Sequence, residues 1–173
     1  MTPETKQIIA QAIGIIAMVL CISSFQFKKN KHLFIVQGIS STLFFVHYLL
    51  LGQNAGAFMN MLAILRSVCL NFKILRNRVC EILLIIGFLA IAALTYQNWL
   101  TILILIAQIG GTVVYWQNNA KRIRIFQLSV SSPCWLLHNA FIFSIGGIIT
   151  EVFNIISTTI SIVRFRKSGF DEN

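Results

Sequence analysis

Residues 135–151 read WLLHNAFIFSIGGIITE, an apolar run that ends on a carboxylate, Glu151. Residues 44–60 read FFVHYLLLGQNAGAFMN and follow the same pattern. Each stretch has 17 residues, opens on an aromatic residue, carries His in the fourth place and Gly in the thirteenth, and ends on a polar residue. Two matching apolar stretches predict an internal repeat, and an acid within apolar sequence indicates a functional position.

The composition of the chain is that of an integral membrane protein. Of its 173 residues, 57% are hydrophobic and 11% are charged, whereas a soluble domain carries roughly a quarter charged residues. The mean hydropathy of +0.79 agrees with this assignment. The net charge of +9 comes from short basic clusters between apolar runs. Such clusters set membrane topology and do not form a nucleic-acid-binding face, so the expected partner is the lipid bilayer and not nucleic acid.

Seven transmembrane helices are predicted from the lengths of the apolar runs and the breaks within them. A helix needs about 20 mostly apolar residues to cross a bilayer, and three of the runs are too long for one crossing. Turn signals divide these runs at Gly52–Asn54, Tyr96–Trp99 and Ser144–Gly147. The first run lacks an AxA-like cleavage site, so it is expected to be retained as a span. The predicted spans are 7–27, 33–51, 55–75, 80–96, 99–118, 124–143 and 147–166.

The basic residues predict the orientation of these spans. Twelve of the fourteen Lys and Arg residues fall in or directly beside every second connection, or at the end of the last span. Because positive loops stay in the cytoplasm, the N-terminus is expected outside and the C-terminus in the cytoplasm. The twelve residues are Lys28, Lys29, Lys31, Lys73, Arg76, Arg78, Lys121, Arg122, Arg124, Arg164, Arg166 and Lys167.

The repeat extends beyond the two opening stretches. When residues 44–60 are aligned with residues 135–151, His47 meets His138, and the same alignment continued outward pairs Phe25-Gln26 with Trp116-Gln117. A single linker span between two three-helix units would let both units insert in the same orientation. The predicted fold is therefore all-α, with 3+1+3 parallel repeats. Its parts are a first unit at 1–76, a linker helix at 77–97 and a second unit at 98–173.

These features resemble the SWEET, SemiSWEET and PQ-loop superfamily, and within it the chain is most similar to the small YgjV-type bacterial inner-membrane proteins. The resemblance covers nearly the whole chain. Units of this superfamily carry Pro-Gln at the end of the first helix. Here Gln26 and Gln117 are kept, whereas Phe25 and Trp116 stand in the places of the prolines. The units also carry Trp-x-x-Tyr-Gly in the second helix and an Asn sixteen residues after the Trp.

The second motif falls on the two opening stretches. The places of its Trp, Tyr and Asn are taken by Phe44, His47 and Asn60 in the first unit, and by Trp135, His138 and Glu151 in the second. In sugar-carrying members the Trp and the Asn line the central substrate cavity. The resemblance therefore implies a pocket formed by Phe44, Asn60, Trp135 and Glu151, and it implies transport of a small, sugar-sized polar solute.

Polar side chains inside the predicted spans have alternative roles. Glu151 faces either a central cavity, where it could bind hydroxyls, a cationic solute or a proton, or the outer water near a helix end. His47 and His138 either contact a polar solute or relay protons, or they form interhelical hydrogen bonds. Arg66 lies about 120° from Asn60 around the helix axis. It is therefore expected to point away from the site, and its simplest role is to extend toward the inner headgroups. The alternatives are a buried ion pair or a gating role.

Two functional hypotheses remain once enzymes are set aside. No HExxH, GxSxG, P-loop or paired-carboxylate pattern occurs, so no enzymatic activity is expected. The four cysteines lack metal-like spacing, and neither a metal nor a cofactor is expected. The chain is predicted to be a multi-pass protein of the bacterial inner membrane that transports a small polar solute. The alternative is a non-transporting sensor, receptor or assembly partner with the same fold, and the oligomeric state is left open.

Overall fold

The computed structural model of the protein describes residues 3–141 and 145–168. The described chain is helical throughout, with short connections and no β-strand in those ranges. A π-helical segment, η1 (Gln127–Ser131), joins α6 to α7 without a break, so the described residues form seven helical rods. The helices are α1 (Pro3–Ser24), α2 (Asn30–Leu50), α3 (Asn54–Asn71), α4 (Arg78–Leu94), α5 (Leu100–Trp116), α6 (Ala120–Phe126), α7 (Ser132–Phe141) and α8 (Ile145–Ser168).

Each rod corresponds to one predicted span to within about four residues at either end. Residues 142–144, which include the end of the sixth predicted span and Ser144 of the predicted break, lie outside the described residues. By length and composition, three described helices are long and apolar enough to cross a membrane, namely Glu4–Ser24, Asn30–Leu50 and Gly146–Arg166, and α5 is a shorter apolar helix. The fold is therefore all-α, as predicted, and it agrees with a helical membrane protein.

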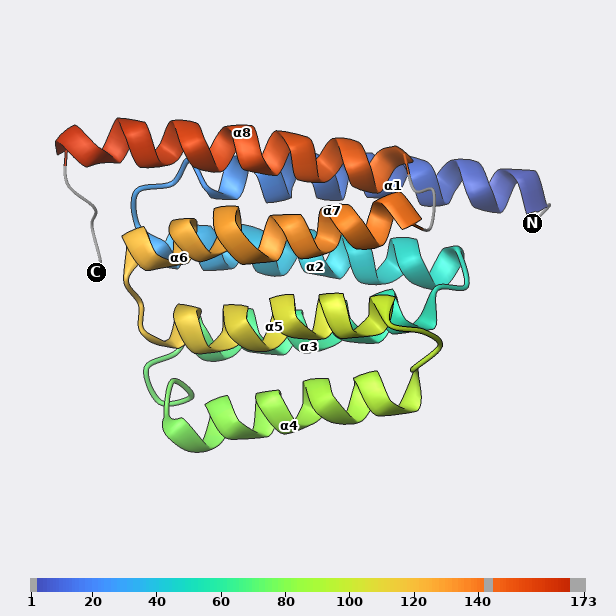
Figure 1. Ribbon diagram of the computed structural model, residues 1–173, viewed down its shortest axis with the longest axis horizontal. Coiled ribbons are helices and arrows are strands. Elements are labelled where there is room, and N and C mark those ends of the chain that lie inside the picture. The colour runs from blue at the N-terminus through green and yellow to red at the C-terminus, as the bar shows by residue number, and fades with distance from the viewer. Residues whose placement is uncertain (1–2, 142–144, 169–173) are drawn as a thin grey trace.

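The rods pack in two layers, with one further helix at an edge (Figure 1). In the first layer α2 lies between α1 and α3 and packs against both. In the second layer α7, with η1, lies between α8 and α5. The layers meet at their two sides, where α1 packs against α8 and α3 packs against α5. The remaining helix, α4, lies beside α3 and α5.

The middle of the two layers is less tightly packed than their sides. Helices α2 and α7 overlap in Figure 1, but they are not among the closely packed pairs of described helices. Side chains from both helices instead surround a cavity. Helix α4 lies away from this cavity and is attached to α3 and α5 by a buried apolar cluster. That cluster contains Met59, Leu62, Leu84, Phe88, Ala92 and Ile104.

Local interactions in the connections determine where several helices begin. The side-chain oxygen of Asn77 accepts a hydrogen bond from the Cys80 N–H at 3.0 Å and caps α4. The side-chain oxygen of Asn119 caps α6 in the same way, with the Arg122 N–H at 2.9 Å. In the turn between α2 and α3, Gly52 has a φ of 73°, a left-handed conformation that Gly adopts without steric cost.

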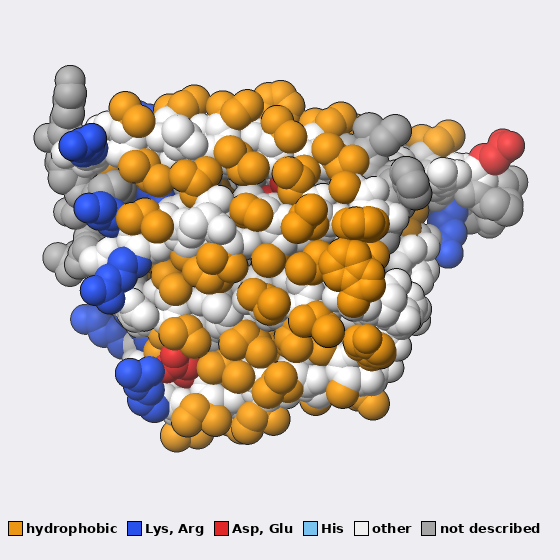
Figure 2. All heavy atoms as spheres, viewed as in Figure 1, with side chains coloured by type: hydrophobic (Ala, Val, Ile, Leu, Met, Phe, Trp, Pro, Cys, Tyr) orange, Lys and Arg blue, Asp and Glu red, His pale blue; other side chains and the backbone are white. Residues whose placement is uncertain are grey.

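The surface separates apolar sides from a basic end. Figure 2 shows hydrophobic side chains across the visible side of the bundle and most of the Lys and Arg side chains in view gathered at one end. Large hydrophobic side chains are also exposed along individual helices, such as Ile15 of α1, Leu83 of α4 and Phe153 of α8. Soluble monomers rarely expose an apolar surface of this extent, whereas hydrocarbon chains of a bilayer would cover it.

Candidate functional site

A polar cavity lies between the two layers of helices. Every described rod except α4 contributes residues to its lining. The cavity offers about 120 Å³ to the centres of water molecules, and one water needs roughly 10–15 Å³ of such space. It therefore has room for several waters or for one small solute. Its polar lining includes Gln37, Ser41, Asn60, Gln108, Gln127 and Asn154.

Four of the six residues singled out from the sequence line this one cavity. They come from four different helices: Phe44 from α2, Asn60 from α3, Trp135 from α7 and Glu151 from α8. Asn60 Nδ2 donates a hydrogen bond to the Gly56 carbonyl at 2.8 Å within its own helix, so its side-chain oxygen is not used in that bond. The structure thus brings together the aromatic and polar positions of both repeat stretches.

The two histidines lie apart from the cavity lining. His47 Nδ1 lies 2.7 Å from the Ala10 carbonyl oxygen and so links α2 to α1. This is the interhelical hydrogen bond that formed one of the two sequence-based alternatives. The buried Nδ1 of His138 has no hydrogen-bond partner among the described residues. The His138 ring packs edge-on against Trp135, with a centroid separation of 5.7 Å, so it supports a cavity residue from behind.

Glu151 is buried in the wall of the cavity, with 7% of its surface exposed. It therefore does not face the outer water, although it lies near the start of α8. Asn154 Nδ2 lies 3.4 Å from each carboxylate oxygen. The Ser132 hydroxyl, which accepts a hydrogen bond from Gln127 Nε2 at 2.9 Å, also hydrogen-bonds to the carboxylate. Neutral donors alone thus contact this acid within the described part of the chain.

Arg66 also lines the cavity, which corrects the expectation that it extends toward the headgroups. The residue is buried, with 9% of its surface exposed. Its Nη1 donates to the Gln108 side-chain oxygen at 3.0 Å and lies 3.3 Å from the Thr112 hydroxyl. The expectation failed because the long side chain reaches across to α5, so the angle between Arg66 and Asn60 on α3 did not decide where the guanidinium lies.

Two aromatic rings and a glycine also surround the Arg66 guanidinium. The Arg66 Cζ lies 5.0 Å from the centroid of Tyr115 and 5.8 Å from that of Phe88, both within the range of cation–π attraction. A Cβ at Gly111 would lie 3.3 Å from Nη1, so the absence of a side chain at this position lets α5 approach the guanidinium closely. The sequence shows the basic residue inside a predicted span, but not the partners on α5.

Arg124 is a second buried cation that the sequence does not reveal. It was expected to belong to a solvent-facing topology cluster, yet it is fully buried. Its Nε donates to Ser161 Oγ at 2.6 Å, and its Nη2 donates to the Phe25 and Phe27 carbonyls at 3.1 Å and 2.6 Å. One guanidinium therefore connects α6, α8 and the end of α1. Its neighbours Lys121 and Arg122 are exposed, as the topology prediction requires.

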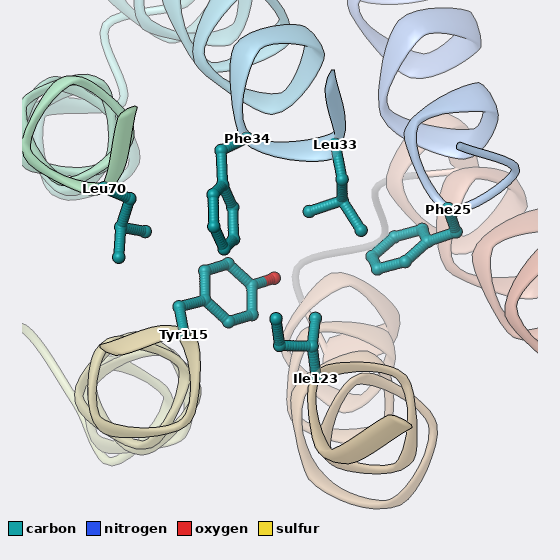
Figure 3. Packing of buried hydrophobic residues seen from close by; sticks show 6 residues of the cluster. All are labelled: Phe25, Leu33, Phe34, Leu70, Tyr115 and Ile123. Atoms are coloured by element: carbon teal, nitrogen blue, oxygen red, sulfur yellow. The ribbon is translucent and has the colours of Figure 1, made fainter. Parts of the chain in front are cut away.

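An apolar cluster closes the cavity at the basic end of the bundle. Figure 3 shows its side chains pointing toward one another from several helices. All members lie in the terminal turns of their helices, or just beyond them, on the side where Lys and Arg gather. The members are Phe25, Leu33, Phe34, Leu70, Tyr115 and Ile123. Tyr115 belongs both to this cluster and to the cavity lining, so the cluster forms the floor of the cavity.

The chemistry of the site consists of two opposite charges and many neutral polar groups. Arg66 and Glu151 line the same cavity, but no ion pair joins them. Within 3–141 and 145–168, no group of three His, Cys, Asp or Glu side chains is placed to hold a metal ion. The arrangement can hold a polar or charged solute by hydrogen bonds and charge, with Phe44, Trp135 and Tyr115 as apolar walls.

The relationship of the chain to known proteins follows from one family match. The model of the Imp-YgjV family, described as bacterial inner membrane protein, matches residues 8–169. No curated protein and no solved structure matches the chain, and the resemblance to the SWEET, SemiSWEET and PQ-loop superfamily stays a prediction. The family match agrees with the apolar helices and with the YgjV-type resemblance of the sequence. The chain therefore belongs to the Imp-YgjV family of bacterial inner membrane proteins.

Proposed function

We propose that the protein carries a small polar solute across the inner membrane, through a central site between two three-helix units. The observation that carries this proposal is the polar cavity inside a bundle whose outer sides are apolar. Buried charges in a membrane protein are costly and mark solute or ion pathways. Arg66 and Glu151 are such charges, and both line the cavity. No enzymatic role is proposed.

The arrangement of the helices supports the parallel 3+1+3 repeat within this proposal. If α1, α2 and α3 correspond to α5, α7 and α8, a two-fold axis along the bundle exchanges the two layers of Figure 1, and α4 is the linker. Asn60 and Glu151 each lie six positions after the first residue of their helices. The Tyr48 ring and the Asn139 amide each pack onto a glycine eight residues later, Gly56 and Gly147.

The basic end supports an orientation for the transporter. The four Lys and Arg clusters of the seven-span arrangement follow α1, α3, α5 and the main part of α8, whose ends lie at the same end of the bundle (Figure 1). The positive-inside rule places this end in the cytoplasm. With that orientation, the apolar cluster around Tyr115 and the Arg124 hydrogen bonds close the cytoplasmic side of the cavity. Transport would then require a second state in which these contacts separate and the outer side closes.

A non-transporting sensor or receptor is the second candidate, and one observation favours it. The two units are joined at the basic end by several hydrogen bonds, including Asn30 Nδ2 to the Asn118 carbonyl at 2.7 Å and Arg124 to two carbonyls near the end of α1. The hinge prolines of SWEET-like units are absent from Phe25 and Trp116. A bundle fixed in this way could bind a solute without releasing it inside.

The experiment that separates the two candidates measures access to the cavity from each face of the membrane. Ser41 lines the cavity, so Ser41→Cys is placed in a variant in which the four native cysteines are replaced. A transporter predicts labelling by a small membrane-impermeant thiol reagent from either face. Labelling from the outer face alone, together with solute binding, would instead support the receptor. Phe153→Cys, which is half exposed on the outer side of α8, controls for labelling outside the cavity.

Transport itself is tested in proteoliposomes with a panel of radiolabelled sugars, amino acids and amines. Glu151→Gln keeps the shape of the side chain and removes its charge, so it is expected to reduce uptake at least about tenfold. The matched control is Glu81→Gln, because Glu81 is also buried but pairs with Arg78 on α4, outside the cavity. Uptake that is equal in all three proteins would count against the central site.

A further inference from the structure

We propose that the cavity binds a small zwitterionic solute of the amino-acid type, with its carboxylate at Arg66 and its ammonium at Glu151. This inference rests on the proposed function for its transport step, but the binding it describes can be measured without transport. It narrows the substrate class from polar solutes in general to those that carry both charges. The observation that supports this inference is that Arg66 and Glu151, the two charged residues that line the cavity, each lack an ionic partner among the described residues.

The Arg66 side of the cavity is built to receive an anion. The guanidinium is fixed by Gln108 and Thr112 and is covered by aromatic rings, so its position is set before any ligand arrives. These partners are neutral and leave its positive charge uncompensated. In addition, the Arg66 Nε–H has no acceptor among the described residues. Guanidinium groups bind carboxylates in a planar, two-point geometry, which makes a carboxylate the natural counterpart.

The Glu151 side of the cavity is built to receive a cation. The carboxylate is contacted by the amide of Asn154 and the hydroxyl of Ser132, both neutral. The Asn154 side-chain oxygen, in a residue with 1% of its surface exposed, has no donor among the described residues. An ammonium group carries three N–H donors. It would satisfy both the carboxylate and this second acceptor.

The two ends are separate enough to act on different parts of one ligand. Arg66 lies on α3 and Glu151 on α8, and these helices are not a closely packed pair among the described rods. A direct ion pair would have consumed both charges. Instead an unpaired hydrogen-bond donor lies on the Arg66 side of the cavity and an unpaired acceptor lies on the Glu151 side. A neutral sugar would leave both charges uncompensated, and a simple cation or anion would leave one.

The remaining walls would hold the side chain of such a ligand. Phe44 and Trp135 line the cavity from α2 and α7, the two central helices, and neither is fully buried. Aromatic walls accept apolar or aromatic groups without requiring hydrogen bonds. The volume of about 120 Å³ open to water centres limits the ligand to a small solute. Single amino acids therefore fit the site better than peptides or larger molecules.

The test measures binding of matched ligands to the full chain in detergent by isothermal titration calorimetry. L-alanine is compared with ethylamine and propionate, which lack its carboxylate and its ammonium respectively. L-phenylalanine is compared with phenethylamine and 3-phenylpropionate, and D-glucose is the neutral ligand. At least one amino acid is expected to bind about tenfold or more tightly than each of its two analogues. Equal binding of an analogue, preferred binding of glucose, or no binding of either amino acid would overturn the proposal.

Variants that lack one of the two cavity charges are tested for which ligand they bind most tightly. A purely structural role of Arg66 or Glu151 would not change this ligand preference. Glu151→Gln is expected to reverse the preference toward the carboxylate analogue, because only Arg66 keeps its charge. Arg66→Gln is expected to reverse it toward the amine. Glu81→Gln should keep the preference of the unmodified chain. If Arg66→Gln does not fold, the Glu151→Gln reversal and the ligand series on the unmodified chain still decide the matter.

The same ligands in proteoliposomes separate this inference from the proposed function. Tight amino-acid binding without uptake would contradict the proposed transport but support the zwitterion-binding site, as expected for a receptor. Uptake of glucose with no preference for either amino acid would support the proposed transport but contradict the zwitterion-binding site. Uptake of an amino acid, but of neither of its analogues, is the result expected if both hold.

Discussion

Arg124 Nη2 lies 2.6 Å from the Phe27 carbonyl oxygen, so a side chain of α6 holds the loop that follows α1. The same guanidinium donates to the Phe25 carbonyl and to Ser161 on α8. Three segments that are distant in the sequence are thus joined by one buried cation. Phe25 also belongs to the apolar cluster of Figure 3. The hydrogen bonds of Arg124 and this cluster therefore close the cavity together at the basic end of the bundle.

Removing this cation should destabilise the bundle strongly. In Arg124→Met, several carbonyl and hydroxyl groups lose a charged donor, and each such bond contributes about 1.5–3 kcal/mol. We expect the free energy of unfolding, measured by SDS titration in mixed micelles, to fall by about 3 kcal/mol or more. Arg122→Met is the matched control, since Arg122 is exposed and bonds to Gln117. Its effect should stay within about 0.5 kcal/mol, and similar losses in the two variants would contradict the role of Arg124.

Two adjacent glycines at the start of α8 should differ sharply in their tolerance of a methyl group. A Cβ at Gly147 would lie 2.3 Å from Asn139 Cγ, whereas a Cβ at Gly146 would have no neighbour within 4 Å among the described residues. We expect Gly147→Ala to lower the unfolding free energy by about 1–3 kcal/mol through overpacking. Since no described residue would contact the new methyl group, Gly146→Ala should be neutral or stabilising by up to about 1 kcal/mol, because Ala favours helix more than Gly. Thermal unfolding of both variants in one detergent checks the ranking.

The contact between α1 and α2 can be tested by a double-mutant cycle. His47 bonds to the Ala10 carbonyl, and a Cβ at Gly14 would lie 2.7 Å from His47 Nδ1. Gly14→Ala and His47→Ala should each destabilise the chain, the second by about 1–2 kcal/mol. The double variant should be more stable than additivity predicts by about 1 kcal/mol, because the methyl group occupies space vacated by the ring. Additive losses would show that the two positions do not share this space.

The same histidine variant addresses the alternative role of His47 as a solute contact. His47 does not line the cavity, so His47→Ala should leave ligand affinity within about twofold of the unmodified chain once both are folded, a change of well under 1 kcal/mol. Calorimetric titration at a temperature below the unfolding transition measures this. Loss of binding with unchanged stability would restore the solute contact that the sequence suggested.

The orientation of the chain can be checked with single cysteines in its connections. Lys29 and Lys121 lie at the basic end, whereas Gln97 lies in the opposite connection between α4 and α5. With positive residues inside, Gln97→Cys should react with an impermeant thiol reagent in intact cells. Lys29→Cys and Lys121→Cys should react only after the membrane is permeabilised. The reverse pattern would invert the proposed orientation and the side of the membrane that the cavity floor closes.

The positions of the helices could be predicted from the sequence because charges and turn residues mark their ends. The predicted span 80–96 corresponds to α4 and 33–51 to α2, with Asn77 and Gly52 in the adjoining connections. The shared cavity position of Phe44, Asn60, Trp135 and Glu151 agrees with the repeat, since matching residues of two related units fall on corresponding faces. Local patterns were sufficient to locate the helices, whereas the grouping of these four residues came from the resemblance to SWEET-like units.

The partners of the two arginines could not be predicted, because they depend on helix packing. Whether Arg124 meets water or the Phe25 carbonyl is decided by where α1 and α8 lie, and no single helix encodes that. The π-helical segment was also missed, although Pro133 is a local signal for it. Pro133 has no N–H for the Ser129 carbonyl, and the helix widens just before it, with the Ser132 N–H bonded to the Gln127 carbonyl.

The contact between α1 and α8 joins two helices that lie far apart in the sequence. Gln26 Nε2 donates to both the carbonyl and the hydroxyl of Ser157 at 2.8 Å, and the Ser157 hydroxyl donates to the Ile22 carbonyl at 2.7 Å. While the ribosome is still translating the middle of the chain, the Gln26 side chain and the Ile22 carbonyl have no final partner. Completion of the bundle is therefore a late event in biogenesis, and a nascent chain stopped before α8 would leave an open polar seam for quality-control proteases to recognise.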